Sequence, residues 1–148
     1  MRVRMIPAAW LLLAIVAMVL ADKYFPIAEY SLPAAKIVGN ILFALSVLTF
    51  VTSAWQFHKS ETTVDPLGEA TSLITGGPFR ISRNPIYLAM VFLLCGLALR
   101  MGSATPWPVI AAFIWVIQTR QIAREEQQLA ARFSDVYADY CRRVRRWL

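Results

Sequence analysis

The side chains best suited to chemistry lie in two short stretches. Residues 76–87 read GGPFRISRNPIY, a turn with two arginines that leads directly into an apolar run. Further along the chain, Glu125 and Glu126 follow another apolar run. A cationic turn and a carboxylate pair at the same end of two apolar segments predict a ligand site at the surface of a membrane.

The sequence does not favour a metal site, a Ser-His-acid site or a phosphate-binding loop. His58 is the single histidine, and Cys95 and Cys141 are far apart, so no zinc site is predicted. A Ser-His-acid set is not evident, and neither common glycine-rich phosphate loop is present. Cys95 has nothing beside it in the sequence that would activate a thiol, and inert packing is expected for both cysteines.

The elements that must position these stretches are apolar segments. Hydrophobic residues make up 58% of the 148-residue chain. The apolar segments are 6–21, 34–55, 86–101 and 105–118. A helix needs about 20 apolar residues to cross a bilayer, and helix is the default inside lipid. We therefore predict an all-α integral membrane protein with about four transmembrane helices and a cytoplasmic C-terminal helix.

The fourth predicted span does not stop at the membrane surface. Residues 118–133 contain helix formers and neither glycine nor proline. Polar residues recur there every three or four positions, at Gln118, Gln121, Glu125, Gln128 and Arg132. Glu126 falls outside this polar stripe, so a structural role is expected for it. Ser134 is predicted to cap a final helix over 135–147.

The positive charges predict the orientation in the membrane. With four spans, every lysine and arginine except Lys23, Lys36 and Arg100 falls on the side of the two termini. This asymmetry predicts a multi-pass protein of the inner (cell) membrane with both termini in the cytoplasm. It also accounts for the net charge of +6 without nucleic acid, for which no binding motif is present. The alternative for 6–21, a removable signal peptide, fits less well because the rest of the chain is also apolar.

Two motifs resemble a known family. The stretches GPFRISRNPIYLA (77–89) and EEQQLAARFSDVYADYCRRVRRWL (125–148) resemble signatures of the isoprenylcysteine carboxyl methyltransferase and phospholipid methyltransferase superfamily. The resemblance implies methyl transfer from S-adenosylmethionine to a hydrophobic or membrane-resident acceptor, through a carboxylate, an amine or a thiol. It implies one domain over 1–148, with two N-terminal spans in 1–55 and a cofactor-binding core in 56–148. The expected partners are the lipid bilayer and a lipid or small hydrophobic acceptor.

The resemblance also assigns residues to the site. Cofactor binding is expected at Thr71, Ser72, Leu73, Ile74, Phe79, Asn84, Pro85, Ile86, Tyr87 and Glu125. Arg83 and Glu125 are the predicted catalytic residues, and Gln121 and Arg120 are candidates for contact with the substrate. Gln121 stands where many members carry an arginine linked to the substrate carboxylate, so carboxyl methylation is not the only acceptor chemistry to consider.

The chemistry of the cofactor fits these residue types. Glu125 can accept hydrogen bonds from hydroxyl groups or pair with an ammonium group. The rings of Phe79 and Tyr87 can attract a cation. Arg83 and the backbone amides of the turn can bind a carboxylate.

Two alternatives are considered for the function. An NADPH-dependent membrane reductase would have a similar C-terminal region, but such enzymes are longer. A non-catalytic lipid-binding membrane protein is kept open by the glutamine at position 121.

Overall fold

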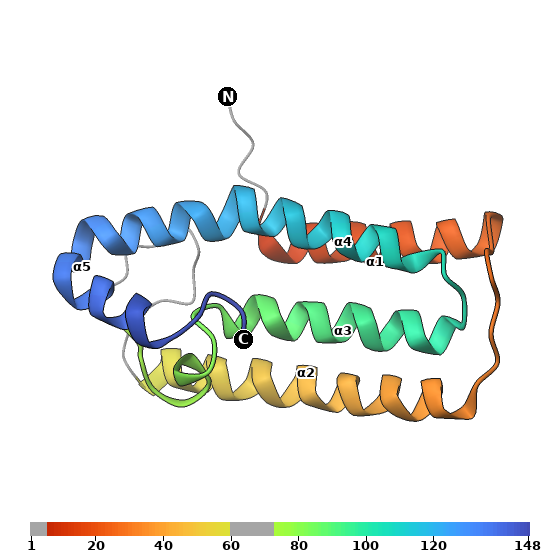
Figure 1. The fold of residues 1–148 in the computed structure, drawn as a ribbon, viewed down its shortest axis with the longest axis horizontal. Coiled ribbons are helices and arrows are strands. Elements are labelled where there is room, and N and C mark those ends of the chain that lie inside the picture. Colours follow the sequence, from red (N-terminus) through yellow and green to blue (C-terminus); the bar gives the residue numbers. More distant parts are fainter. Residues whose placement is uncertain (1–5, 60–72) are drawn as a thin grey trace.

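The computed structural model describes residues 6–59 and 73–148, which form helices joined by short connections (Figure 1). In chain order these are α1 (Pro7–Tyr24), α2 (Pro33–Lys59), the 3₁₀ turn η1 (Gly77–Arg80), α3 (Pro85–Met101), α4 (Pro106–Ile117), the π-helical turn η2 (Gln118–Ile122) and α5 (Ala123–Arg143). The described ranges contain no strand, which confirms the predicted all-α class.

Proline marks the start of every long apolar helix. Pro7, Pro33, Pro85 and Pro106 are the first residues of α1, α2, α3 and α4. The first turn of a helix does not use its N–H groups, so proline is tolerated there and its fixed φ favours the helix. Gly102 ends α3 with a φ of 75°, in the left-handed region that glycine adopts without strain. The chain then turns back into α4 within a few residues.

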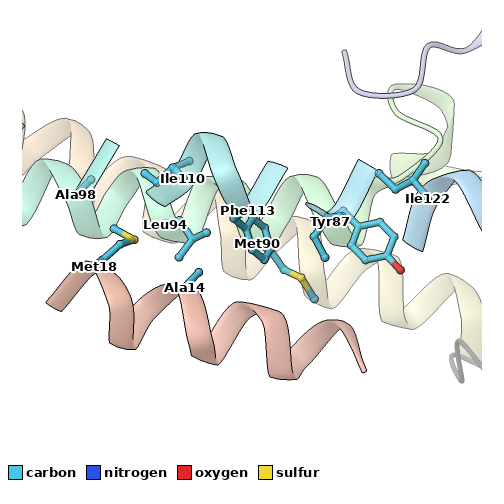
Figure 2. Packing of buried hydrophobic residues seen from close by; sticks show 10 residues of the cluster. Ala14, Met18, Tyr87, Met90, Leu94, Ala98, Ile110, Phe113 and Ile122 are labelled. Atoms are coloured by element: carbon cyan, nitrogen blue, oxygen red, sulfur yellow. The ribbon is translucent and has the colours of Figure 1, made fainter. Parts of the chain in front are cut away.

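The helices pack as two pairs. α2 lies along α3, and α1 packs against α4 and also touches α3 (Figure 1). The buried core lies between α1, α3 and α4, where Met18, Leu94 and Phe113 meet (Figure 2). This core ends at Tyr87 and Ile122, close to the two stretches of chemical interest.

Small residues allow the close approach of α2 and α3. A Cβ atom added to Gly39 would lie 2.8 Å from the carbonyl oxygen of Gly96, and one added to Gly96 would lie 2.8 Å from the carbonyl oxygen of Gly39. Ser46 and Ser53 follow Gly39 at intervals of seven residues, and both are buried. Small side chains at the contact are the usual means by which membrane helices pack closely.

The connections at the end away from η1 are bonded to each other. The N–H of Tyr30 donates to the carbonyl of Gly102, and the N–H of Ala104 donates to the carbonyl of Ile27. Thr105 accepts from the N–H of Ile27 through its hydroxyl oxygen, 2.9 Å away. The α1–α2 and α3–α4 connections, both at the right of Figure 1, are therefore joined where the two helix pairs meet.

Much of the apolar surface is exposed. Phe43, Phe50 and Trp55 on α2 are each about half exposed or more, and α1 shows a similar outer face. α1 and α2 are long and apolar enough to cross a membrane. α3 has 17 residues and α4 has 12. The four predicted spans therefore correspond to four helices, but length and composition support membrane crossing for two of them.

The region after α4 differs in part from the prediction. The helix continues beyond 118 as expected, but Gln118–Ile122 is π-helical, which the polar stripe did not predict. At Ser134 the backbone takes φ 38° and ψ −114°, and this kink divides α5 into two helical parts, the second of which begins near residue 135 as predicted. α5 ends at Arg143 and Val144 is extended, so the predicted helix over 135–147 is wrong in its last residues. Beyond Arg143, the backbone carbonyls of Arg145 and Arg146 accept hydrogen bonds from residues 82–84 instead of from a further helical turn.

Candidate functional site

Tyr87 and Glu125 join the two stretches predicted to carry the chemistry. Tyr87 lies in the first turn of α3 and Glu125 in the first turn of α5. The Tyr87 hydroxyl donates to Glu125 Oε1 over 2.5 Å. Figure 2 shows the Tyr87 ring at the end of the core, beside Ile122. The structure thus brings together two of the predicted cofactor-binding residues, one at the start of α3 and one beyond the end of α4, at the same end of the hairpin that these helices form.

The surroundings of Glu125 disfavour its charged form. Burial raises the pKa of the Glu125 carboxyl above its ordinary value, and the hydrogen bond from Tyr87 lowers it in part. The negative charge of Glu126 raises the same pKa further. A carboxylate in such a place is stabilised by a cation or by hydrogen-bond donors from a ligand, which is a feature typical of binding and catalytic sites.

The turn η1 is hydrogen-bonded to α5 and packs against the end of α2. The Tyr140 hydroxyl donates to the carbonyl of Phe79 over 2.7 Å. The Phe79 ring is buried and meets the edge of Phe57 from the end of α2, with 5.6 Å between ring centroids. Gly77 has a φ of 55°, and a Cβ there would lie 2.6 Å from Nε2 of Gln56. The positive φ at position 77 favours glycine, whereas the flexible side chain of Gln56 could move away from a Cβ atom.

Residues 82–84 are bonded to the C-terminal end of the chain. The N–H of Arg83 donates to the carbonyl of Arg145 over 2.9 Å. Ser82 Oγ and Asn84 Nδ2 both donate to the carbonyl of Arg146, over 3.2 Å and 3.1 Å. Ser82 and Asn84 are buried, so these bonds satisfy polar groups that water does not reach.

Glu126 lies between two arginines. Arg83 Nη2 is 3.2 Å from Glu126 Oε1. Arg146 contacts both carboxylate oxygens, with Nε 3.1 Å from Oε1 and Nη2 2.5 Å from Oε2. The hydrogen bond to Glu126 raises the pKa of Arg146. These contacts agree with the structural role expected for Glu126.

Arg83 is engaged within the protein. Besides its ion pair with Glu126, its guanidinium donates to the sulfur of Cys141. Its Nε is buried and has no hydrogen-bond partner in the described part of the chain. The side chain thus links the turn to α5, and its predicted contact with a cofactor carboxylate stays a prediction.

The other predicted residues are distributed around this centre. Pro85 is fully buried and Ile86 packs against the core, and both residues lie in the first turn of α3. Leu73 packs with Tyr137 and Tyr140, and Ile74 is partly buried. Thr71 and Ser72 lie outside the described residues.

The two candidate substrate residues lie in the π-helical turn η2. Arg120 is exposed and Gln121 is partly buried. Gln118, at the start of the same turn, accepts a hydrogen bond at Oε1 from Trp147 Nε1 over 3.1 Å. That contact was not predicted, although Gln118 belongs to the polar stripe and Trp147 to the second quoted motif.

Comparison with known proteins agrees with the family resemblance of the two motifs. A protein of Haemophilus influenzae described as "Uncharacterized protein" is 41% identical over 63 residues, which are 43% of this chain and all of that protein. No solved structure matches this chain. The family model for phospholipid methyltransferase matches residues 34–136, which include α2, η1, α3, α4 and most of α5. This chain therefore belongs to the phospholipid methyltransferase family.

Proposed function

We propose that this chain transfers a methyl group from S-adenosylmethionine to a hydrophobic acceptor that resides in the membrane. The observation that carries the proposal is the contact between Tyr87 and Glu125, which unites the two motifs in one partly buried site. Membership of the phospholipid methyltransferase family supports methyl transfer to a lipid-type acceptor.

The residues at the site fit a cofactor that carries positive charge and hydroxyl groups. One oxygen of Glu125 accepts from Tyr87, and an ionised carboxylate has further lone pairs for hydroxyl or ammonium donors. The Tyr87 ring adds an aromatic face that attracts cations. When bound, S-adenosylmethionine supplies a sulfonium-linked methyl group that a nucleophile can displace directly. The work left to the protein is to orient the reactants and to exclude water.

The remaining parts of the proposed site follow from the first turn of α3 and its surroundings. Asn84, Pro85 and Ile86 lead into Tyr87. We propose that these residues line the cofactor site together with Phe79, Leu73 and Ile74. Thr71 and Ser72 are proposed on the resemblance alone. Gln121 and Arg120 are proposed to face the acceptor, because η2 lies between the apolar helices and Glu125.

The proposed arrangement in the membrane places this site at the cytoplasmic surface. α1 and α2 expose apolar side chains over much of their length. We propose that α3 and α4 also cross the bilayer, that both termini are cytoplasmic, and that the membrane is the inner (cell) membrane. An apolar acceptor would then enter from the bilayer and the cofactor from the cytoplasm.

Cofactor binding tests the proposal directly. The protein is purified in detergent and titrated with S-adenosylhomocysteine, the demethylated product, by isothermal calorimetry. We expect saturable binding that Glu125→Gln abolishes, because the substitution removes the negative charge at the centre of the site. Asp135→Asn is the matched control, since Asp135 is an exposed carboxylate on the same helix. Folded wild-type protein that does not bind would contradict the proposal.

The acceptor is identified in a second experiment. Radiolabelled S-adenosylmethionine is incubated with the protein and a total lipid extract, and the labelled product is analysed by mass spectrometry. Transfer of label to a lipid that depends on Glu125 supports an enzyme. Binding without transfer to any lipid would contradict the proposed lipid acceptor.

A further inference from the structure

The last five residues form a segment that touches both halves of the candidate site. α5 ends at Arg143, and Val144 is extended with φ −125° and ψ 132°. We call residues 144–148 the C-terminal strap. Val144 is buried against Tyr137 and Tyr140, which fixes the beginning of the strap on the second half of α5.

The backbone of the strap holds the start of α3. The carbonyls of Arg145 and Arg146 accept three hydrogen bonds from residues 82–84, over 2.9 to 3.2 Å. Asn84 is the residue immediately before α3 and lies three positions before Tyr87. The strap therefore holds the residues just before α3, whose first turn carries Tyr87.

The side chains of the strap hold the start of α5. Arg146 binds Glu126 through two nitrogens, a geometry that fixes orientation as well as distance. Trp147 donates to Gln118 and packs against the core. Glu126 is the neighbour of Glu125 on the same helix, so a shift of Glu126 moves Glu125 with it.

Because the C-terminal strap is bonded to the start of α3 and to the start of α5, it sets the distance between these two helix ends. From these contacts we infer that the C-terminal strap positions Glu125 opposite Tyr87, and that Arg146 is the positioning residue. The inference rests on the proposed function, because the ligand used to test it is the proposed cofactor product.

The neighbouring Arg145 serves as a control for the positioning role of Arg146. It shows whether an effect comes from the specific contact or from a positive charge at the membrane surface. It is adjacent to Arg146 and carries the same charge, but its side chain is exposed. A general effect of positive charge would act through both arginines. An effect of the bidentate contact with Glu126 would act through Arg146 alone.

The test compares Arg146→Ala, Arg146→Lys and Arg145→Ala in full-length protein in detergent. Hydrogen–deuterium exchange of the ligand-free protein is measured over 82–90 and 123–130, and binding of S-adenosylhomocysteine is titrated. We expect Arg146→Ala to accelerate exchange in both segments and to weaken binding about tenfold, since Glu126 loses a bidentate partner. Arg146→Lys keeps the charge without the paired geometry, so it should restore part of both properties. Arg145→Ala should match the wild type in both.

The outcomes separate the two proposals. Wild-type protein that binds, with an Arg146→Ala variant unchanged in exchange and affinity, would overturn the positioning role and leave the proposed function intact. Equal losses in Arg145→Ala and Arg146→Ala would also overturn it, because charge alone would then explain the effect. Wild-type protein that fails to bind would reject the proposed function and the positioning role with it.

Discussion

Two adjacent glutamates on α5 have opposite surroundings. Glu126 is bonded to two arginines, whereas Glu125 contacts a neutral tyrosine hydroxyl. The two arginines balance the charge of Glu126, while burial raises the pKa of the Glu125 carboxyl and makes its charged form costly. Of these two carboxylates, Glu126 is paired with arginines and Glu125 is hydrogen-bonded to Tyr87, which is why Glu125 is the one proposed to bind the ligand. The polar stripe already set Glu125 apart from Glu126 in the sequence, and their partners show the physical difference between them.

The raised pKa of Glu125 predicts the pH dependence of binding. Only the ionised carboxylate attracts a cation, and burial shifts its protonation to a higher pH than the ordinary value of 4.5. Affinity for S-adenosylhomocysteine should therefore be full above this raised pKa and fall as the pH drops through it. Titrations at a series of pH values measure the midpoint. An affinity that stays constant until the pH falls below 4.5 would contradict the prediction.

At the scale of the elements, the contact between α2 and α3 depends on glycine. Gly39→Leu should destabilise the protein by about 2 kcal/mol, because the new side chain meets the backbone of α3 and the helices must separate. Thermal unfolding in detergent measures the change. Ala44→Val adds bulk on an exposed part of the same helix and should have little effect. Equal melting temperatures for Gly39→Leu and Ala44→Val would contradict this account of the contact.

The bend in α5 is the second prediction at this scale. Ser134 holds φ 38° and ψ −114°, a conformation that costs a residue with a Cβ about 1 kcal/mol or more. Ser134→Gly should therefore raise the stability of the folded protein by roughly 1 kcal/mol, provided that the bend is kept. Thermal unfolding again gives the measurement, with Ser53→Gly inside α2 as a control that should lower stability. A lower melting temperature for Ser134→Gly would show that the bend is not strained.

The elements also show where sequence reasoning succeeds and where it stops. The apolar runs, the prolines at the helix starts and Gly102 in the hairpin of α3 and α4 act locally, so the four helices could be predicted. The meeting of Tyr87 with Glu125 followed from two motifs at the same end of that hairpin. The π-helical turn at Gln118–Ile122 has no local signal, because its residues fit an ordinary helix equally well. The conformation of the extended residues after Arg143 depends on partners that are distant in the sequence, such as Glu126. Contacts of this kind leave no periodic pattern in the sequence.

At the scale of the whole molecule, exposed apolar surface predicts firm attachment to the membrane. The outer faces of α1 and α2 carry large apolar side chains, and exposing such an area to water is unfavourable. The protein should stay with the membrane fraction after washes at high salt and at alkaline pH, and it should be released by detergent. Fractionation followed by immunoblotting measures this. Release by high salt alone would indicate an attachment through surface charge instead.

The bonded connections at the far end affect how the molecule can move. The links between Tyr30 and Gly102 and between Ala104 and Ile27 fasten the two helix pairs at the end opposite the site. Tyr87 belongs to one pair, and Glu125 continues the other (Figure 1). A small rotation of one pair about the fastened end would displace these two residues further than any atoms near Gly102. With that end fastened, the bonds of the C-terminal strap to Asn84 and Glu126 are the ones that resist a separation of Tyr87 from Glu125.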